Sequence, residues 1–407
     1  MITIYGREEK NFLLDWIIIG GGIQGCTVAT FLLKSNRTTK KQLCIIDSHS
    51  KPLHSWSCMA NRIGMEFLRS PSVHHIEPEP FHLQKFAGSR GEYNHFYGSY
   101  KRPSLQLFNA HCQSIFNEIE LNDCWNQGRV NHIMKTGNGW TVTTEDGTAR
   151  TAKHVVIAIG VNEQPFLPEW AKHIQDVYPN HVAHIYDKNS QELDLFEPPF
   201  LIIGGGIAAA HLSITLSRRF PGKVILLKRH PFRIYDFDSD PGWLGPKNIN
   251  AFHKIEDFNK RRKEIQQARH KGSIPNNLYQ TLRQLQKKEK LCIMDGEVDS
   301  FSINLNENHI CLDLKQSDDK LNVKSILLAT GFQNTLPGQE WLSSLIEQED
   351  LSCAACGYPI ITKSLEWAPG LYVAGALAEL EVGPVSRNIA GARKAAEKII
   401  SSIKNKS

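Results

Sequence analysis

Short apolar runs, each bounded by glycine, aspartate or a basic residue, recur along the chain. They cover residues 16–19, 43–46, 155–159, 201–203, 224–227 and 326–329. Apolar runs without polar alternation are typical of parallel strands that are buried on both faces. Stretches suited to helices, residues 23–34 and 207–219, follow the first and the fourth run. The pattern therefore predicts two separate βαβ units in an α/β protein.

The first unit carries a glycine-rich turn within the stretch DWIIIGGGIQGCTVATFLL. Gly20, Gly22 and Gly25 form a G-x-G-x-x-G pattern between the predicted strand and helix. In this pattern the first glycine allows a tight turn, the second lets a pyrophosphate approach the backbone, and the third lets helix and strand pack closely. The next strand ends in Asp47, whose carboxylate can accept a hydrogen bond from a ribose hydroxyl. This order predicts a dinucleotide site with a free ribose, and we assign it to FAD.

The second unit repeats the turn within FLIIGGGIAAAHLSITL. Gly204, Gly206 and Ala209 form the G-x-G-x-x-A variant of the same pattern. The strand that follows runs into Lys228 and Arg229, where the acid would stand. A carboxylate would repel a 2′-phosphate, whereas two cations attract one through charge-assisted hydrogen bonds. We therefore assign the second site to NADPH.

Two further segments, HVVIAIGVNEQP and SILLATGFQNTLP, are similar to each other. Both are apolar strands that run into glycine, as expected where a chain leaves one nucleotide domain and later re-enters it. The predicted fold class is therefore α/β, with two Rossmann-like dinucleotide-binding domains and the NADPH domain inserted in the FAD domain. We place the FAD domain at residues 1–164 and 325–407 and the NADPH domain at 165–324, with a linker at about 189–199.

With both turns in place, most of the chain resembles the class B flavin monooxygenases, especially the lysine and ornithine N-hydroxylases of siderophore biosynthesis. The stretch LLATGFQNTLP, which includes Gly331, resembles that family's ATG signature. SWSCM, with Trp56 and Met59, and MEFLRSPS, with Arg69, resemble its stretches near the flavin. The resemblance implies FAD and NADPH as cofactors, with Trp56, Met59 and Gly331 beside them. It also implies Arg69 as a catalytic candidate, in place of the family's lysine.

Two positions depart from the family where it contacts its substrate. Gly64 replaces a glutamine, and Leu244 is the nearest match to a substrate-contacting asparagine. An apolar residue contacts the backbone of an amino acid poorly. The resemblance therefore implies a small molecule with a nucleophilic nitrogen or sulfur as the substrate, and it does not identify ornithine or lysine.

The carboxyl end predicts a strand from Leu371, a turn at Gly375 and a helix that begins near Pro384. Proline in the first helical turn suits such a start. In related flavoproteins this helix directs its N-terminus at the pyrimidine edge of the flavin, where negative charge accumulates on reduction. We therefore add Gly375 and Val385 to the candidate cofactor-binding residues.

Composition and charge exclude several classes of protein. The 407 residues are 41% hydrophobic and 22% charged, as in ordinary globular proteins. A net charge of +5 is too small to indicate nucleic-acid binding, and no run predicts a membrane span. The basic run KRRKEIQQARHKG predicts a solvated helix face. Nine cysteines, an odd number, favour reduced thiols and a cytoplasmic protein. The sequence does not indicate an oligomeric state.

The leading hypothesis is a monooxygenase in which NADPH reduces FAD and a C4a-hydroperoxyflavin transfers an oxygen atom to nitrogen or sulfur. A second is an NADPH-dependent disulfide reductase that uses the C-x-x-C pair of Cys353 and Cys356. A third is a non-catalytic flavin-binding protein with the same fold. We expect no metal, because the His and Glu residues of SVHHIEPEPFH have irregular spacing and two prolines interrupt them.

Overall fold

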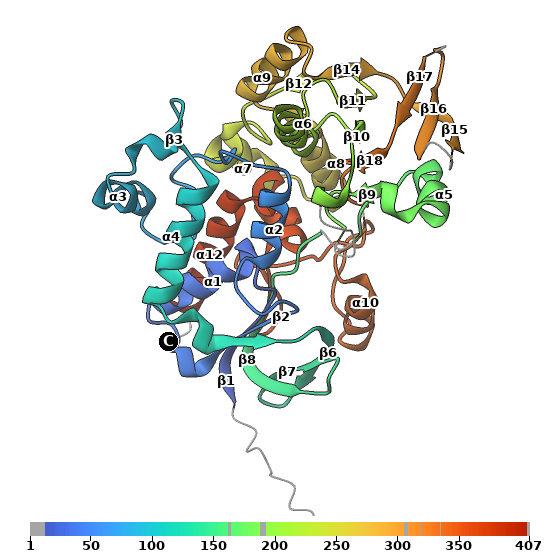
Figure 1. Cartoon of the computed structure of the whole chain (residues 1–407). Helices are drawn as coiled ribbons and strands as arrows, with labels where there is room; N and C mark the ends of the chain where they lie inside the picture. Colours follow the sequence, from blue (N-terminus) through green and yellow to red (C-terminus); the bar gives the residue numbers. More distant parts are fainter. Residues whose placement is uncertain are drawn as a thin grey trace, which may run out of the picture.

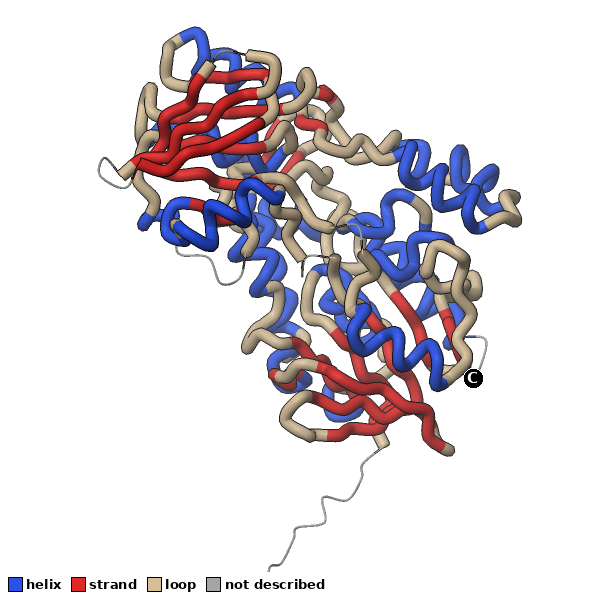
Figure 2. Tube along the Cα trace, turned by 90° about the vertical axis from the view of Figure 1, so that its right-hand side faces the viewer, coloured by secondary structure: helices blue, strands red, loops and turns tan. Residues whose placement is uncertain are grey.

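The computed structural model describes residues 13–161, 164–187, 193–304, 308–317, 319–333 and 335–404. These residues form two large sheets, of eight and five strands, visible as two groups of strands in Figures 1 and 2, together with three small sheets. Residues 189–192 of the predicted linker, and the chain ends at 1–12 and 405–407, lie outside the described residues.

The first sheet has eight strands within the described residues, and its central strands are parallel. Its path is β19 (Glu366–Ala368), β20 (Leu371–Val373), β8 (Ala149–Ile157), β1 (Leu14–Ile19), β2 (Leu43–Asp47) and β5 (Trp125–Gln127). Strand β7 (Gly139–Thr144) pairs antiparallel with β8, and β6 (Val130–Thr136) pairs antiparallel with β7. Helices α1 (Ile23–Lys34) and α12 (Ile389–Lys404) pack against each other beside it (Figure 1). Ile17, Ile18 and Val155 are fully buried in this core, as parallel strands covered on both faces require.

The second sheet is parallel throughout. Its order is β14 (Cys292–Asp295), β11 (Val224–Lys228), β10 (Phe200–Ile203), β18 (Ser325–Leu328) and β9 (Val182–His184). Residues of α6 (Ile207–Arg219) and α9 (Asn276–Lys287) form one core with it. Residues of α5 (Glu169–Val177) and of the antiparallel strands β15 (Val298–Asn304), β16 (His309–Leu314) and β17 (Lys320–Val323) form another.

The observed packing disagrees with the predicted assignment of residues to domains in two places. Strand β18 follows Lys324 directly, yet it pairs in parallel with β10 at the centre of the second sheet. The predicted boundary at 324/325, where the chain would return from the NADPH domain to the FAD domain, is therefore one strand too early in the sequence. The segment η6 (Pro241–Leu244), α7 (Pro246–His253) and α8 (Phe258–Ala268) lies within the predicted NADPH domain, but Trp243 and Ile265 are buried in the core of the first sheet. The rest of the proposed division stays a prediction.

The remaining elements surround the two sheets. They are α2 (His54–Arg62), α3 (His82–Ser89), β3 (Phe96–Tyr97), β4 (Arg102–Pro103), α4 (Leu105–Glu118), β12 (Arg233–Ile234), β13 (Ser273–Ile274), α10 (Gln339–Gln348) and α11 (Glu379–Val382). Two local predictions need correction here. Helix α12 begins at Ile389 rather than near Pro384, because residues 384–387 form a 3-10 turn and the Asn388 side chain accepts from Gly391 N at 3.0 Å. The basic run lies on α8, but Arg262 is buried, so this helix face is not simply solvated.

Candidate functional site

The first glycine turn has the shape that a bound pyrophosphate needs. Gly20 has a φ of +103°, and a Cβ there would lie 2.7 Å from Ala158 O. At Gly25 a Cβ would lie 1.8 Å from Gly20 O, so the helix and strand pack too closely for a side chain. At Gly22 a Cβ would have no atom within 4 Å, and this residue begins α1 without a side-chain cap. Open space and free N–H groups at a helix N-terminus fit a dinucleotide phosphate.

Asp47 lies at the end of β2, next to this turn. Its Oδ2 accepts from Gly21 N at 2.7 Å, and its Oδ1 accepts from His49 N at 2.8 Å. The carboxylate is 18% exposed. Since a carboxylate has about four lone-pair sites, it keeps capacity to accept from a ribose hydroxyl. The position predicted for the acid thus fits FAD.

The residues of α2 begin beside the same turn, because Leu53 N donates to Gly21 O at 2.9 Å. Trp56 Nε1 donates to Asn109 Oδ1 at 3.3 Å, and its ring packs 5.7 Å from that of Phe108. Met59 lies one helical turn further along and is partly buried. Contacts of Trp56 and Met59 with a flavin remain a prediction.

The carboxyl-terminal segment also reaches the first turn. Gln24 Nε2 donates to Ser386 O at 3.0 Å and to Asn388 O at 3.2 Å. A Cβ on Gly375 would lie 3.0 Å from Gln24 Cγ. Val385 is 2% exposed, so only its backbone can contact a cofactor. The structure therefore brings Gly22, Gly375 and Val385 into one neighbourhood, with Gln24 as a connecting residue that the sequence analysis missed.

The second glycine turn repeats this geometry on the other sheet. At Gly204, with a φ of +145°, a Cβ would lie 2.6 Å from Ala329 O. A Cβ on Gly206 would lie 3.5 Å from Gly272 Cα, so a glycine loop faces the turn. Ala209 is 1% exposed, as expected for the position that packs helix on strand. Gly331 follows β18 and has open space within 4 Å of its Cβ position.

The two predicted phosphate-binding cations differ in accessibility. The Lys228 side chain is 5% exposed, forms an ion pair with Asp295 and lies 4.9 Å from the centre of the Phe232 ring. Arg229 is 73% exposed and lies 3.9 Å from a Glu297 oxygen. The expectation of two available cations is thus wrong for Lys228, whose charge is compensated across the sheet. Arg229 alone of the pair is exposed enough to meet a 2′-phosphate.

Arg69 is tied to the second domain. Its guanidinium donates to Asp238 Oδ1 at 2.5 Å, to Tyr235 O at 2.6 Å, to Phe237 O at 2.7 Å and to Ser273 Oγ at 3.0 Å. Burial lowers the pKa of its guanidinium, but the charge stays compensated by Asp238. So many partners indicate a positioning role rather than a free catalytic cation.

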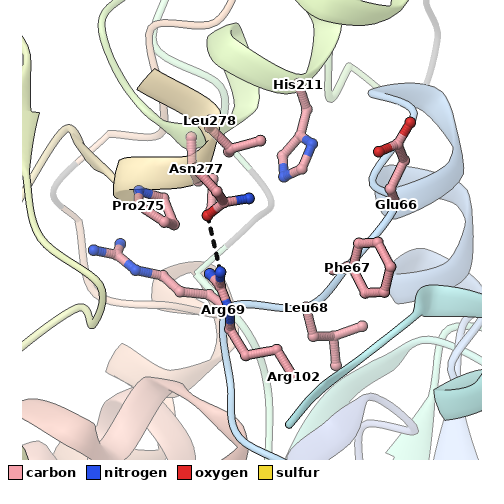
Figure 3. A pocket seen from close by; sticks show the side chains of 10 residues that line it. Glu66, Phe67, Leu68, Arg69, Arg102, His211, Pro275, Asn277 and Leu278 are labelled. Carbon is pink, nitrogen blue, oxygen red and sulfur yellow. Dashed lines mark hydrogen bonds between the residues drawn. The ribbon is translucent and has the colours of Figure 1, made fainter. Parts of the chain in front are cut away.

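Arg69 also borders a cavity of about 20 Å³ between the two sheets, a space for about one water (Figure 3). Arg102 Nη2 donates to Asn277 Oδ1 across it at 2.9 Å. Burial lowers the pKa of the neighbouring His211 to about 4. The cavity is lined by Glu66, Phe67, Leu68, Arg69, Arg102, Ile207, His211, Pro275, Asn277 and Leu278. It is too small to hold a substrate in this conformation.

The C-x-x-C pair lies in a turn between α10 and β19. Cys353 and Cys356 are both free thiols and partly buried. Burial, followed by the charge of Cys356, raises the pKa of Cys353. A redox-active thiol needs a lowered pKa, so this environment does not favour the disulfide reductase.

The described residues contain no group of three or more histidine, cysteine or acidic side chains placed to hold a metal ion. Leu244 packs against the core of the first sheet. Within the same part of the chain, no helix has the length and apolarity needed to cross a membrane.

Residues 17–162 match a protein-family model described as FAD-NAD(P)-binding. No curated protein matches the sequence. Among solved structures, ornithine hydroxylase from Pseudomonas aeruginosa superposes with a TM-score of 0.74 at 14% identity over 97% of this chain and 99% of that one. The cadaverine monooxygenase of desferrioxamine biosynthesis from Erwinia amylovora gives a TM-score of 0.74 at 15% identity, over 97% and 95%.

A third solved structure belongs to the competing class. Bacillithiol disulfide reductase from Staphylococcus aureus gives a TM-score of 0.60 at 17% identity, over 96% of this chain and 98% of that one. At such identities the comparisons establish the fold. The predicted fold class, two Rossmann-like domains, is confirmed, and the resemblance to N-hydroxylating flavoproteins is confirmed in the fold.

Proposed function

We propose that the protein is an FAD- and NADPH-dependent monooxygenase that adds an oxygen atom to a nucleophilic nitrogen or sulfur of a small molecule. The observation that carries this proposal is the pair of glycine turns, each at the end of a parallel strand in a separate sheet. The turn at Gly22 leaves open space beside Asp47, and the turn at Gly206 stands near the exposed Arg229. Two dinucleotide sites in one chain suit transfer of a hydride from one cofactor to another.

The residues of the chain would bind and orient these cofactors. FAD, when bound, supplies the redox and oxygen-activating chemistry. The α1 N-terminus at Gly22 would hold its pyrophosphate, and Asp47 its ribose. Gly206 and Arg229 would hold NADPH. Arg69, through its hydrogen bonds to residues 235–238, would hold the two domains in a fixed relative position.

The fold agrees with a monooxygenase, because the ornithine and cadaverine enzymes superpose with TM-scores of 0.74. It does not by itself separate this function from the disulfide reductase, since another flavin-containing monooxygenase superposes no better than the reductase, at 0.60. The raised pKa of Cys353 adds an independent argument against a thiol relay. A protein that only binds flavin would have no use for a second complete glycine turn.

We further propose a small-molecule substrate, no nucleic-acid or membrane partner, and a cytoplasmic location. The modest charge of +5 and the nine unpaired cysteines support these assignments.

The proposal is tested by reducing the purified flavoprotein with NADPH in the absence of oxygen and then mixing it with oxygen in a stopped-flow spectrometer. We expect bleaching of the flavin by NADPH, then an absorbing transient before the oxidised spectrum returns. Failure of NADPH to bleach the flavin would favour the non-catalytic protein. Direct reoxidation without a transient, with NADPH-driven reduction of a disulfide, would favour the reductase.

A further inference from the structure

Glu379 is fully buried at the start of α11 and is surrounded by three guanidinium groups. Its Oε2 accepts from Arg269 Nη2 and from Arg387 Nε, each at 2.9 Å. Its Oε1 forms an ion pair with Arg262. The side chains of Arg262, Arg269 and Arg387 are 9%, 14% and 28% exposed. One carboxylate thus faces three positive charges.

The neighbouring acid does not offset this excess. Glu381 pairs instead with Lys398 at 2.9 Å, His253 at 3.4 Å and Arg261 at 3.8 Å. Within the part of the chain that the structure describes, Glu379 is the only carboxylate within 4.0 Å of the guanidinium nitrogens of the three-arginine cluster, residues 262, 269 and 387. The cluster carries about two positive charges more than its own acid provides.

Such an excess is costly in a buried place. Burial, with the charges of Arg387 and Arg262, lowers the pKa of Arg269 to about 9. Among the described residues, Nη1 of Arg269 and Nη1 of Arg387 donate to no protein acceptor, and neither atom is fully buried, so both donors can be reached from solvent. Burying a charge without a counterion is strongly unfavourable. An anion at these donors would remove the cost.

The cluster lies between the two glycine turns. Arg269 Nε donates to Pro384 O at 3.0 Å, and Gln24 of the first turn donates to Ser386 O at 3.0 Å. On the other side, Gly272, three residues after Arg269, faces Gly206 of the second turn. This is the region where the reacting ends of two dinucleotides would meet, away from the helix N-termini that suit their phosphates.

We propose that the three-arginine cluster binds a carboxylate of the substrate. The planar fork of a guanidinium matches a carboxylate with two parallel hydrogen bonds. Arg69 is not available for this role, because Asp238 and backbone carbonyls occupy it. This inference rests on the proposed function for its assignment to a substrate, and it narrows the substrate to an acid.

The test uses the full-length, FAD-saturated protein with malonate, its neutral diamide malonamide, and phosphate, at constant ionic strength. Thermal unfolding is followed as each compound is titrated. We expect malonate to raise the midpoint saturably and malonamide to have no effect. Arg269→Gln removes a charge-assisted bond, so its apparent Kd for malonate should rise about tenfold or more.

Matched variants separate binding from damage to the fold. Arg283→Gln changes an exposed arginine of α9 that donates only to Gln286, and it should bind malonate as the wild type does. Arg387→Gln, at the more exposed edge of the cluster, should lose affinity even if Arg269→Gln does not fold. Equal responses to malonate and malonamide, or unchanged affinity in the cluster variants, would overturn the inference.

A competition arm distinguishes the possible sources of the anion. If phosphate binds as well as malonate and NADP+ displaces both, the cluster holds a cofactor phosphate and the substrate assignment is wrong. The assay needs neither NADPH oxidation nor oxygen. Its failure is therefore distinguishable from failure of the proposed function, which appears as missing flavin or missing NADPH oxidation.

Discussion

Arg69 Nη1 lies 2.5 Å from Asp238 Oδ1, and this pair joins a segment beside the first sheet to a segment of the inserted domain. The Arg69 side chain is 11% exposed, whereas that of Asp238 is 58% exposed. The same guanidinium also donates to three backbone carbonyls, those of Tyr235, Asp236 and Phe237. The arginine is thus the buried partner, and the aspartate is accessory.

From this asymmetry we expect unequal effects of mutation. Arg69→Ala should lower the free energy of unfolding by about 1.5–3 kcal/mol, because three backbone carbonyls of the loop at residues 235–237 lose a charged donor that is itself 11% exposed. Asp238→Asn should cost under about 1 kcal/mol, since an exposed ion pair contributes little. Urea denaturation of both variants measures this. Equal losses would show that the ion pair, rather than the carbonyl contacts, holds the segments together.

Gly22 and Gly25 should respond differently to a side chain. Gly22→Leu adds atoms to open space that we assign to FAD, so the protein should fold without its yellow cofactor. Gly25→Ala would place a Cβ against Gly20 O and should destabilise the fold itself. Flavin absorbance and thermal unfolding are compared for both. A full complement of FAD in folded Gly22→Leu would contradict the assignment of the first turn.

The preference for NADPH should depend on Arg229. Arg229→Ala removes an exposed cation, and loss of one charge-assisted bond of about 1.5 kcal/mol would raise the KM for NADPH roughly tenfold. The KM for NADH, which lacks the 2′-phosphate, should stay unchanged. Arg283→Ala, on α9, is the control for the loss of one surface charge. Equal use of both nucleotides by the wild type would remove the basis for this prediction.

The Cys353→Ser, Cys356→Ser double variant should oxidise NADPH and react with oxygen at the wild-type rate. The reason is that burial raises the pKa of Cys353, whereas reactive redox thiols have a lowered pKa. Steady-state NADPH oxidation provides the measurement. Loss of turnover, with the flavin still bound, would instead support the disulfide reductase.

Acid should destabilise the fold through buried histidines. His75 accepts from Glu77 N through Nδ1 at 3.2 Å, and its Nε2 lies 3.1 Å from Pro80 O, an arrangement that suits the neutral ring. Burial, and then the charge of Arg393, lowers its pKa to about 3. The unfolded chain, with a histidine pKa near 6.5, then binds the proton first. Stability is fully present above about pH 6.5 and falls as the pH drops toward 3.

Each such histidine contributes a slope of about 1.4 kcal/mol per pH unit between the two pKa values. The free energy of unfolding falls between pH 6 and pH 4.5, and His75→Gln should reduce the slope of this fall by the contribution of about one proton. Denaturant unfolding at several pH values measures the slope. An unchanged slope would mean that His75 is protonated in the folded protein.

Local features were predictable because they depend on a few consecutive residues. Gly20 specifies a turn through its backbone freedom, Gly22 and Gly25 leave room because they lack side chains, and the apolar run after Asp15 is typical of a buried strand. The order of strand, turn and helix therefore predicted both nucleotide units, and the family model over residues 17–162 agrees with the first. The sequence by itself determined the fold class and the cofactor chemistry that we propose.

Only the tertiary structure decided which distant residues meet. Ser325 pairs with Phe200, so the strand after Lys324 joins the second sheet. Asp295 neutralises Lys228 from 67 residues away. Glu379 pairs with Arg262, so part of the basic run lies in a buried cluster. These outcomes depend on sheet register and on helix packing between segments that are far apart in the sequence. The residues next to a cation in the sequence are the same whether the cation pairs with a distant acid or lies in solvent, so local sequence cannot separate the two cases.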